Sequence, residues 1–518
     1  MRHVSTLWKA NAIAFISSFC VMVIELIAAR LLAPYIGVSL YTWTSIIGVI
    51  LAGIALGNYL GGKVADRYPS PSVLALIFFT GALLTITILP TIKVVTSNDW
   101  FGHLPIMLNF VLKTSCIFLL PAIVLSMVSP MVIKLTLANL GQTGGIVGTI
   151  YACSTAGAIL GTFMTGFYFI LWFGTRSIVW VVAATLLLTG VLAWFSWSVP
   201  GRWNISMKNF IIWNVTILVF LACSLLFQLK GNWQENYTKE SNYFAIQVLT
   251  SEDNTKWLVL DHLVHSYVVP EDPTVLKYAY LQIFREIISY VARENQTPRV
   301  LHLGGGGYSL PRYLETVYPG SVNEVAEIDP AVTQVAYQEL GLPIGTAIKT
   351  YNQDARLFLI QRKAENKYHI VVGDVFNDYS TPYHLTTLEF NRLVKANMEP
   401  DGIYLVNIID DYDQGKYLPS FIHTLRQAFD YVYVFSPVES SENRGISTFV
   451  IAASDRCIDE ADYNRFVTED GYKEAVGKLY SETSLDKFLA DREPFLLTDD
   501  YVPTDILVAP LHGKRDVQ

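Results

Sequence analysis

Cysteine is scarce in this chain, and its five copies exclude several common uses of the residue. Cys20, Cys116, Cys153 and Cys223 lie in apolar segments, and only Cys457 lies in the polar second half. A disulfide within that half is therefore excluded, and no two cysteines have the spacing of a metal site. We expect no metal cofactor, and the redox compartment stays undetermined.

Acidic residues are almost absent from the first 230 positions. Only Glu25, Asp66 and Asp99 stand there against 12 lysines and arginines, a balance of +9. The remaining residues hold 42 acids and 25 basic residues, a balance of −17. The chain is too long for one ordinary core, and this shift in charge divides it in two. An acidic second half disfavours nucleic-acid binding and mildly favours cationic substrates.

Seven apolar stretches in the first half are long enough to cross a bilayer. They cover residues 10–30, 40–61, 72–92, 106–128, 146–171, 177–198 and 209–229. Two of them carry glycine at every fourth position, which lets helices touch closely in lipid. These glycines are Gly53, Gly57 and Gly61 in one stretch and Gly157 and Gly161 in another. We predict a multi-pass α-helical transmembrane bundle over residues 1–232, whose first stretch is a retained anchor because no clear cleavage site follows it.

Glu25 falls in the middle of the first apolar stretch. An ionisable side chain inside a membrane is costly, so it usually pairs with another group or lines a polar cavity. Both a structural pair and a role in moving a substrate or a proton stay open for Glu25.

The second half alternates strand and helix patterns. Short strands rich in β-branched and aromatic residues are predicted at 243–248, 256–260 and 264–269, and a helix at 274–294. Further strands are predicted at 300–303, 322–327, 347–351, 370–374, 403–407, 431–435 and 448–452. We therefore predict a small β-domain with a connecting helix over 233–297, and a mainly parallel, Rossmann-like α/β sheet over 298–518.

Glycines follow the first strand of that sheet, and carboxylates follow the next three. In chain order the residues are Gly304, Gly305, Gly306, Glu327, Asp354 and Asp374. Ligands of such sheets bind at the carboxyl ends of the strands, where glycine lets the backbone approach a nucleoside and an acid can take two ribose hydroxyls. Each acid alone could also be a helix cap or a loop residue.

From about residue 240 to 452 the order of motifs resembles spermidine synthase and related aminopropyltransferases. That family joins a small N-terminal β-domain to a sheet of the S-adenosylmethionine-dependent methyltransferase type. The matching segments are LDHLVH (260–265), GGGGYSLPRYLE (304–315), VAEIDPAV (325–332), DA (354–355) and HIVVGDVFNDYSTPYHLTTLEFNRLV (369–394). The whole chain is similar to membrane-fused homologues of spermidine synthase.

The resemblance implies roles for particular residues. Asp374 would be the catalytic base, and the glycine turn with Glu327, Asp354 and Ala355 would hold the nucleoside. Candidates for binding the other substrate are His265, Tyr280, Asp378 and His384. The implied reaction is attack of an amine on decarboxylated S-adenosylmethionine, with 5′-methylthioadenosine as the leaving group and without a metal.

Several positions depart from the family pattern. Gly307 stands where the family has the acid that meets the amine of the decarboxylated substrate, so intact S-adenosylmethionine stays open as the co-substrate. His265 replaces a glutamine, and the second acid of an Asp-x-x-Asp pair is displaced by one, to Asp378. The acidic run at 410–413 is typical of a solvated loop, although it could attract a polyamine.

Three functions are compatible with this sequence. The first is a membrane-bound transferase of the aminopropyltransferase kind, which Asp374 favours. The second is another reaction on intact S-adenosylmethionine, by a lyase, cyclase or methyltransferase. The third is a non-catalytic transporter or sensor that binds a nucleoside. Expected partners are a small amine and the lipid bilayer but no nucleic acid, and a homodimer stays open.

Two arguments disagree about the side of the membrane on which the second half lies. The basic residues place the N-terminus in the cytoplasm, and seven spans would then put the second half outside. Because sulfonium nucleosides are cytoplasmic metabolites, we expect a cytoplasmic soluble domain.

Overall fold

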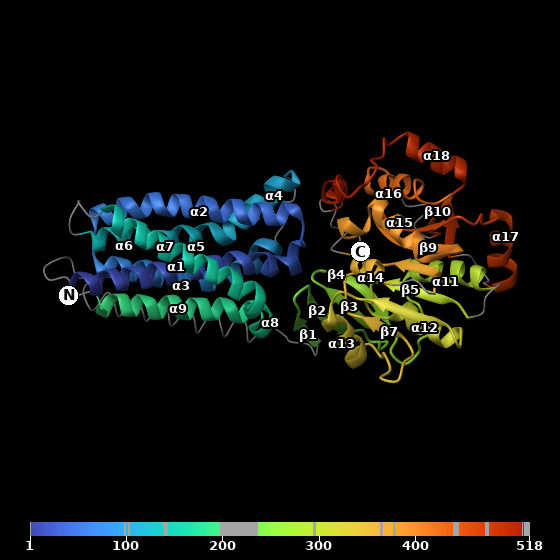
Figure 1. Cartoon of the computed structure of the whole chain (residues 1–518), viewed down its shortest axis with the longest axis horizontal. Coiled ribbons are helices and arrows are strands. Elements are labelled where there is room, and N and C mark those ends of the chain that lie inside the picture. The colour runs from blue at the N-terminus through green and yellow to red at the C-terminus, as the bar shows by residue number, and fades with distance from the viewer. Residues whose placement is uncertain are drawn as a thin grey trace. The chain divides into compact units, whose positions relative to one another are not determined.

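A computed structural model describes residues 2–97, 100–101, 104–137, 143–196, 237–293, 297–362, 366–376, 380–438, 445–471, 476–509 and 511. The chain divides into two compact units, Met1–Gln234 and Glu235–Gln518. The first unit consists of helices and the second combines strands with helices (Figure 1).

The described part of the first unit contains six helical runs that are long and apolar enough to cross a membrane. Its elements are α1 (Arg2–Ile36), α2 (Leu40–Arg67), α3 (Pro71–Ser97), α4 (Ile106–Thr114), η1 (Ser115–Leu119), α5 (Leu120–Ser126), α6 (Val128–Thr136), α7 (Thr143–Met164), η3 (Thr165–Phe169), α8 (Ile170–Phe173) and α9 (Thr175–Ser196). They correspond to six of the seven predicted stretches. The seventh, 209–229, lies outside the described residues.

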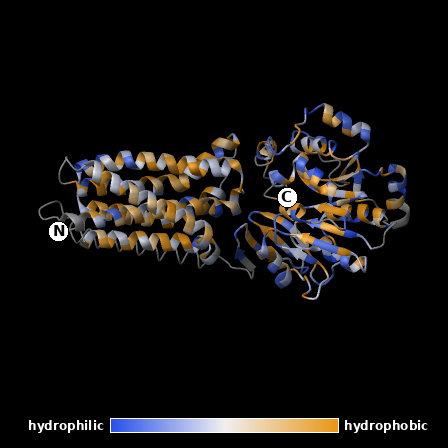
Figure 2. Ribbon diagram, viewed as in Figure 1, coloured by the Kyte–Doolittle hydropathy of each residue, from blue (hydrophilic) through white to orange (hydrophobic). Residues whose placement is uncertain are grey.

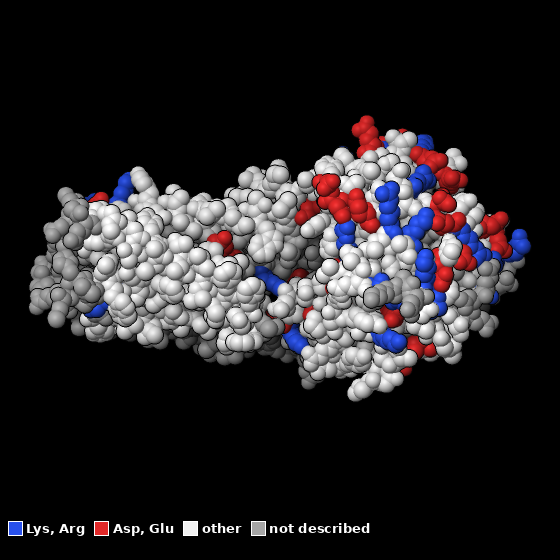
Figure 3. All heavy atoms as spheres, viewed as in Figure 1, with Lys and Arg blue, Asp and Glu red and all other residues white. Residues whose placement is uncertain are grey.

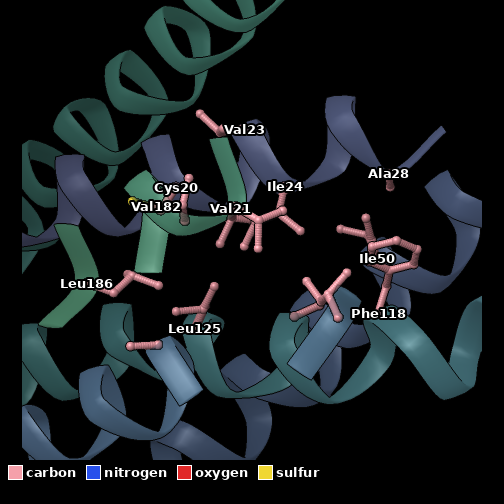
Figure 4. Packing of buried hydrophobic residues seen from close by; sticks show 14 of the residues in the cluster. Cys20, Val21, Val23, Ile24, Ala28, Ile50, Phe118, Leu125, Val182 and Leu186 are labelled. Atoms are coloured by element: carbon pink, nitrogen blue, oxygen red, sulfur yellow. The ribbon is translucent and has the colours of Figure 1, made fainter. Parts of the chain in front are cut away.

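The surface of the helical unit is largely apolar. Figure 2 shows hydrophobic residues along the whole length of its helices, and Figure 3 shows few charged side chains on its visible face. Inside, buried side chains from several helices form one core (Figure 4). The π-helical turn η1 ends two residues before Pro121, which cannot donate a backbone hydrogen bond within the fourth span.

The second unit contains two sheets. The small antiparallel sheet has the order β1 (Tyr237–Glu240), β2 (Ala245–Thr250), β3 (Lys256–Leu260) and β4 (Leu263–Val268). The large sheet has the order β12-β10-β11-β9-β8-β5-β6-β7. Its strands are β5 (Arg299–Leu303), β6 (Val322–Ala326), β7 (Lys349–Tyr351), β8 (Tyr368–Gly373), β9 (Met398–Asp411), β10 (Tyr431–Pro437), β11 (Ile446–Ser454) and β12 (Gly477–Leu479).

The parallel pairing that the sequence predicts is confined to β5 through β9. β10, β11 and β12 are antiparallel to their neighbours, so the large sheet is mixed. The parallel half has the doubly wound arrangement of a methyltransferase-like fold.

Helices cover both faces of the large sheet. Adjacent residues of β5 belong to opposite cores, Val300 with α11 and α12 and Leu301 with α14, α15 and α16. The helices are α11 (Ala279–Ala292), α12 (Ser309–Val317), α13 (Pro330–Glu339), α14 (Ala355–Gln361), η4 (Tyr383–Leu385), α15 (Leu388–Ala396), α16 (Tyr417–Leu425), α17 (Glu460–Arg465), η5 (Phe466–Gly471), α18 (Glu482–Ala490) and α19 (Thr504–Leu507). The predicted helix at 274–294 begins later, at Ala279, because Tyr278 is still extended.

Candidate active site

The strand order of the large sheet reverses between β5 and β8. Ligand sites of doubly wound sheets form at such a point, beyond the carboxyl ends of the strands. Gly304 follows β5 with a φ of +91°, and a Cβ on it would collide with the carbonyl oxygen of Asp374. The backbone N–H of Asp374 donates to the carbonyl of Leu303 at 3.0 Å. Glycine at 304 thus lets the two strand ends close on one another, which brings the glycine turn and Asp374 to one rim.

Glu327 is tied to the same glycine turn. Its Oε2 accepts the N–H groups of Gly305 at 2.7 Å and Gly306 at 3.3 Å, and its Oε1 accepts that of Asp329 at 2.9 Å. Burial raises the pKa of Glu327, whereas the three N–H groups oppose this rise by stabilising the carboxylate. The turn and the carboxylate therefore fix one another, as the predicted nucleoside site requires.

Asp354 and His384, two separately predicted residues, form a pair. Asp354 caps α14 by accepting the N–H of Leu357 at 2.9 Å, and its other oxygen lies 2.8 Å from Nε2 of His384. The hydrogen bond with His384 holds the pKa of Asp354 below its ordinary value. Arg356 donates to the carbonyl of His384 at 3.1 Å, which fastens η4 to α14. Ala355 is buried beside this pair.

Asp374 follows β8 and accepts hydrogen bonds from two side chains. The hydroxyl of Tyr280 donates to Oδ2 at 2.9 Å, and Nδ2 of Asn407 donates to Oδ1 at 3.1 Å. Burial raises the pKa of Asp374, and the two donors counteract the rise. Burial and the nearby carboxylate raise the pKa of Tyr280 well above its usual value, so it remains a donor. Each carboxylate oxygen keeps a lone pair for a further donor.

Asn407 is a residue that the sequence prediction missed. It lies on β9 and is 3% exposed, and its Oδ1 has no hydrogen-bond partner among the described residues. β9 pairs with β8 in parallel, so Asn407 ends up beside Asp374. The signal was its position at the end of the predicted strand 403–407, but only carboxylates were considered at strand ends.

Comparison with known proteins bears on this geometry. No family model matches the chain. A polyamine aminopropyltransferase of Vibrio vulnificus is 28% identical over 181 residues, which cover 35% of this chain and 58% of that protein. A probable polyamine aminopropyl transferase of Bifidobacterium longum is 25% identical over 316 residues, which cover 57% of this chain and 67% of that protein. The chain is thus similar to polyamine aminopropyltransferases over part of its length. The chain spans 58% of the length of the first of these relatives.

Among solved structures, a probable spermidine synthase from Corynebacterium glutamicum aligns with a TM-score of 0.45 at 22% identity. The alignment covers 52% of this chain and 97% of that one.

In the second unit, β4 packs against Gly307, the position at which the resemblance to spermidine synthase would place a loop acid. The N–H of Gly307 donates to Oγ of Ser266 at 2.9 Å. A Cβ on Gly307 would lie 2.6 Å from both Cβ of Ser266 and Cγ2 of Val268. The next residue, Tyr308, is fully buried with a left-handed φ of 55°. β4 therefore fills the space in which an acidic side chain would begin.

Two predicted residues of the second unit remain, His265 and Asp378. His265 is on β4, with Nδ1 at 3.1 Å from the carbonyl oxygen of Leu263. Asp378 lies outside the described residues. Tyr278 links β4 to the cluster, because its hydroxyl donates to the carbonyl of Val264 at 2.7 Å and its ring centroid is 5.2 Å from that of Tyr280. Within the described ranges, no group of three or more His, Cys, Asp and Glu residues is arranged to hold a metal ion.

Proposed function

We propose that the chain is a membrane-bound transferase that moves an alkyl group from an adenosyl sulfonium compound to an amine. The observation that carries this proposal is the position of Asp374, held by Tyr280 and Asn407 beside the glycine turn that Glu327 fastens. Binding a nucleoside alone would need the turn and Glu327, but not a buried acid with two donors. The similarity to polyamine aminopropyltransferases supports the same reaction class.

The proposed mechanism places one residue in each chemical role. An amine is mostly protonated at neutral pH and must lose a proton before it can attack. Asp374 accepts that proton, and its raised pKa makes it a stronger base than an exposed aspartate. The amine nitrogen forms a bond to the methylene carbon beside the sulfur as the carbon–sulfur bond breaks. The sulfur leaves as a neutral thioether, so no acid is needed on that side.

A second candidate is a reaction on intact S-adenosylmethionine. In the family the loop acid meets the amine of the decarboxylated substrate, and at Gly307 that acid is replaced by a contact with Ser266. A lyase, cyclase or methyltransferase reaction would use the same nucleoside site. We place transfer to an acceptor amine first because Asp374 is suited to deprotonating it, and the decarboxylated substrate first because the similar proteins are named polyamine aminopropyltransferases.

We further propose that the helical unit is embedded in the cell membrane and that the soluble unit is cytoplasmic. The six described runs support the first point. The second point rests on the proposed substrate, because sulfonium nucleosides are cytoplasmic metabolites, and the basic loops place the N-terminus on the same side.

The test is to incubate the purified full-length protein with S-adenosylmethionine or its decarboxylated form, each with and without putrescine. We expect 5′-methylthioadenosine and an aminopropylated amine, identified by mass, only when putrescine and the decarboxylated form are both present. Release of 5′-methylthioadenosine without an amine would support the second candidate instead. Binding without any product would contradict both enzymatic functions.

Tyr280→Phe should move the acid limb of the pH profile of kcat/KM to higher pH. The base must be ionised, so activity is present above the pKa of Asp374 and lost as the pH falls through it. Burial raises this pKa and the Tyr280 hydroxyl lowers it, so removing the hydroxyl raises it further. Tyr278→Phe is the matched control, because that hydroxyl donates to a backbone carbonyl. If the acid limb of the kcat/KM profile of the Tyr280→Phe protein lay at an unchanged or lower pH, Asp374 would not be the titrating base.

A further inference from the structure

The helical unit contains an internal repeat that the sequence prediction overlooked. Six positions of α2 carry the same residue as the position 104 residues later, in α7 or η3. The pairs are Ile46 and Ile150, Ala52 and Ala156, Gly53 and Gly157, Leu56 and Leu160, Gly57 and Gly161, and Gly62 and Gly166. The same spacing relates α1 to the span from α4 to α6, and α3 to α9. The six described spans therefore form two sets of three.

Contacts between the helices repeat with the same spacing. A Cβ on Gly57 would collide with the carbonyl oxygen of Ile123, and one on Gly161 would lie 2.7 Å from that of Phe19, which stands 104 residues before Ile123. Gly53 and Gly157 face the carbonyl oxygens of Leu119 and Phe15, which are separated by the same 104 residues. The second helix of each set thus packs on the first helix of the other set in the same way.

The directions of these helices show that the two sets are inverted. Gly157 of α7 contacts Phe15 of α1, and Gly161, four residues later, contacts Phe19, also four residues later. The contacts advance in the same direction along both chains, so the two helices run parallel. The glycine contacts of α2 likewise advance along the span from η1 to α5, so those also run parallel. Since α1 and α2 are joined by only three residues and run in opposite directions (Figure 1), the first helices of the two sets are antiparallel. An axis in the plane of the membrane relates the sets.

Mostly apolar side chains fill the region between the first helices of the two sets. Val21 and Ile24 of α1 lie near Phe118 and Leu125 of the fourth span (Figure 4), and all four are buried. A described hydrogen bond joins these helices, from Oγ of Ser17 to the carbonyl of Leu125 at 3.1 Å. The close glycine contacts tie α1 to α7 and α2 to the fourth span, so these helix pairs are the bodies that such an interface lets shift against each other with little loss of directional bonding. Inverted repeats that rock against one another are the basis of alternating access in many secondary transporters.

Glu25 breaks the repeat. Its counterpart 104 residues later is Ser129, so only one set carries a carboxylate at this level. The other acid of the described spans, Asp66, lies near the end of α2 and pairs with Lys134 at 2.6 Å, and its side chain is 73% exposed. Glu25 is half-buried on α1, and an ionisable group within a membrane usually serves a substrate or a pair.

We propose that the helical unit is a transporter of alternating-access type for a small protonated amine, with Glu25 as the group that meets the ammonium. The inverted repeat and Glu25 support the proposal of transport. The choice of an amine as the transported solute rests on the proposed function of the second unit. A simple anchor would need one helix and no inverted repeat.

Uptake by proteoliposomes tests this proposal. We expect the full-length protein to take up radiolabelled putrescine or spermidine with saturation, and Glu25→Gln to reduce the uptake at least tenfold. Glu25→Asp should keep part of it, and Asp66→Asn, the matched acid of the same unit, should keep nearly all of it. No uptake above that of protein-free liposomes would overturn the proposal, as would full uptake by a correctly folded Glu25→Gln protein.

The same preparations separate this proposal from the proposed enzyme. Formation of 5′-methylthioadenosine is measured in detergent, where Glu25→Gln should equal the unmodified protein because Glu25 takes no part in the soluble site. Uptake without turnover would support the proposed transporter and contradict the proposed transferase. Turnover without uptake would do the opposite. Size-exclusion profiles and melting temperatures identify a variant that fails to fold.

Discussion

Asp374→Asn should lower turnover by about 10²–10⁴-fold, the usual contribution of a general base. Asparagine has nearly the same shape and can still meet Asn407 and Tyr280, but it cannot take a proton from an attacking amine. The hydrogen bonds between the glycine turn and Glu327, where we propose that the nucleoside binds, do not involve the Asp374 carboxylate. Affinity for 5′-methylthioadenosine should therefore change less than about threefold, a difference below 1 kcal/mol. Product formation and calorimetric binding measure the two effects separately.

Asp401→Asn is the control for the loss of one negative charge, because Asp401 is exposed on the same unit. It should leave both turnover and binding as they are. Turnover within tenfold of the unmodified protein in Asp374→Asn would contradict the assignment of the base. Loss of nucleoside binding in that variant would mean that Asp374 acts in the nucleoside site instead.

The positions of the acids at the rim could be predicted because topology alone determines them. Glu327, Asp354 and Asp374 each follow one parallel strand, and parallel strands end on the same side. The partners of these acids could not be predicted in the same way. Tyr280 reaches Asp374 from a helix 94 residues earlier, and His384 reaches Asp354 from 30 residues later. Such pairings depend on how helices pack on the sheet, which the strand pattern does not specify.

The prediction of a solvated loop at 410–413 was wrong for Asp410 and Asp411, whereas Asp413 does lie in an exposed turn. β9 continues to Asp411 because it pairs with β11 along its whole end, and both Asp410 and Asp411 are 1% exposed. Asp410 accepts the N–H of Leu418 at 2.7 Å, and burial raises its pKa to about 7. Asp411 accepts the N–H groups of Asp413 and Gln414, both at 2.9 Å. A run of acids indicates solvent only when no backbone N–H groups converge on it, and the sequence does not show where they converge.

Gly307→Asp, which introduces the acid that the resemblance to spermidine synthase would place there, should damage the second unit instead of improving it. The new Cβ would lie 2.6 Å from Ser266 and from Val268, and overpacking of this kind costs about 1–3 kcal/mol. The carboxylate would also lie beside buried β4 side chains, which adds a desolvation cost. Because Gly305 and Gly306 hold Glu327 in the same turn, nucleoside affinity should fall at least tenfold, or about 1.4 kcal/mol. Thermal unfolding and binding of 5′-methylthioadenosine measure both losses.

Gly345→Asp is the matched control, since a Cβ on Gly345 has no neighbour within 4 Å; it should affect neither property. Adding Ser266→Gly to Gly307→Asp removes one of the two obstructing side chains and should restore part of the stability, which separates the collision with β4 from a general effect of charge. If Gly307→Asp alone instead gained affinity for decarboxylated S-adenosylmethionine at unchanged stability, β4 would have to move away from the turn with little cost. The room for the family acid would then be present in this chain, and the argument for intact S-adenosylmethionine as the co-substrate would lose its structural basis.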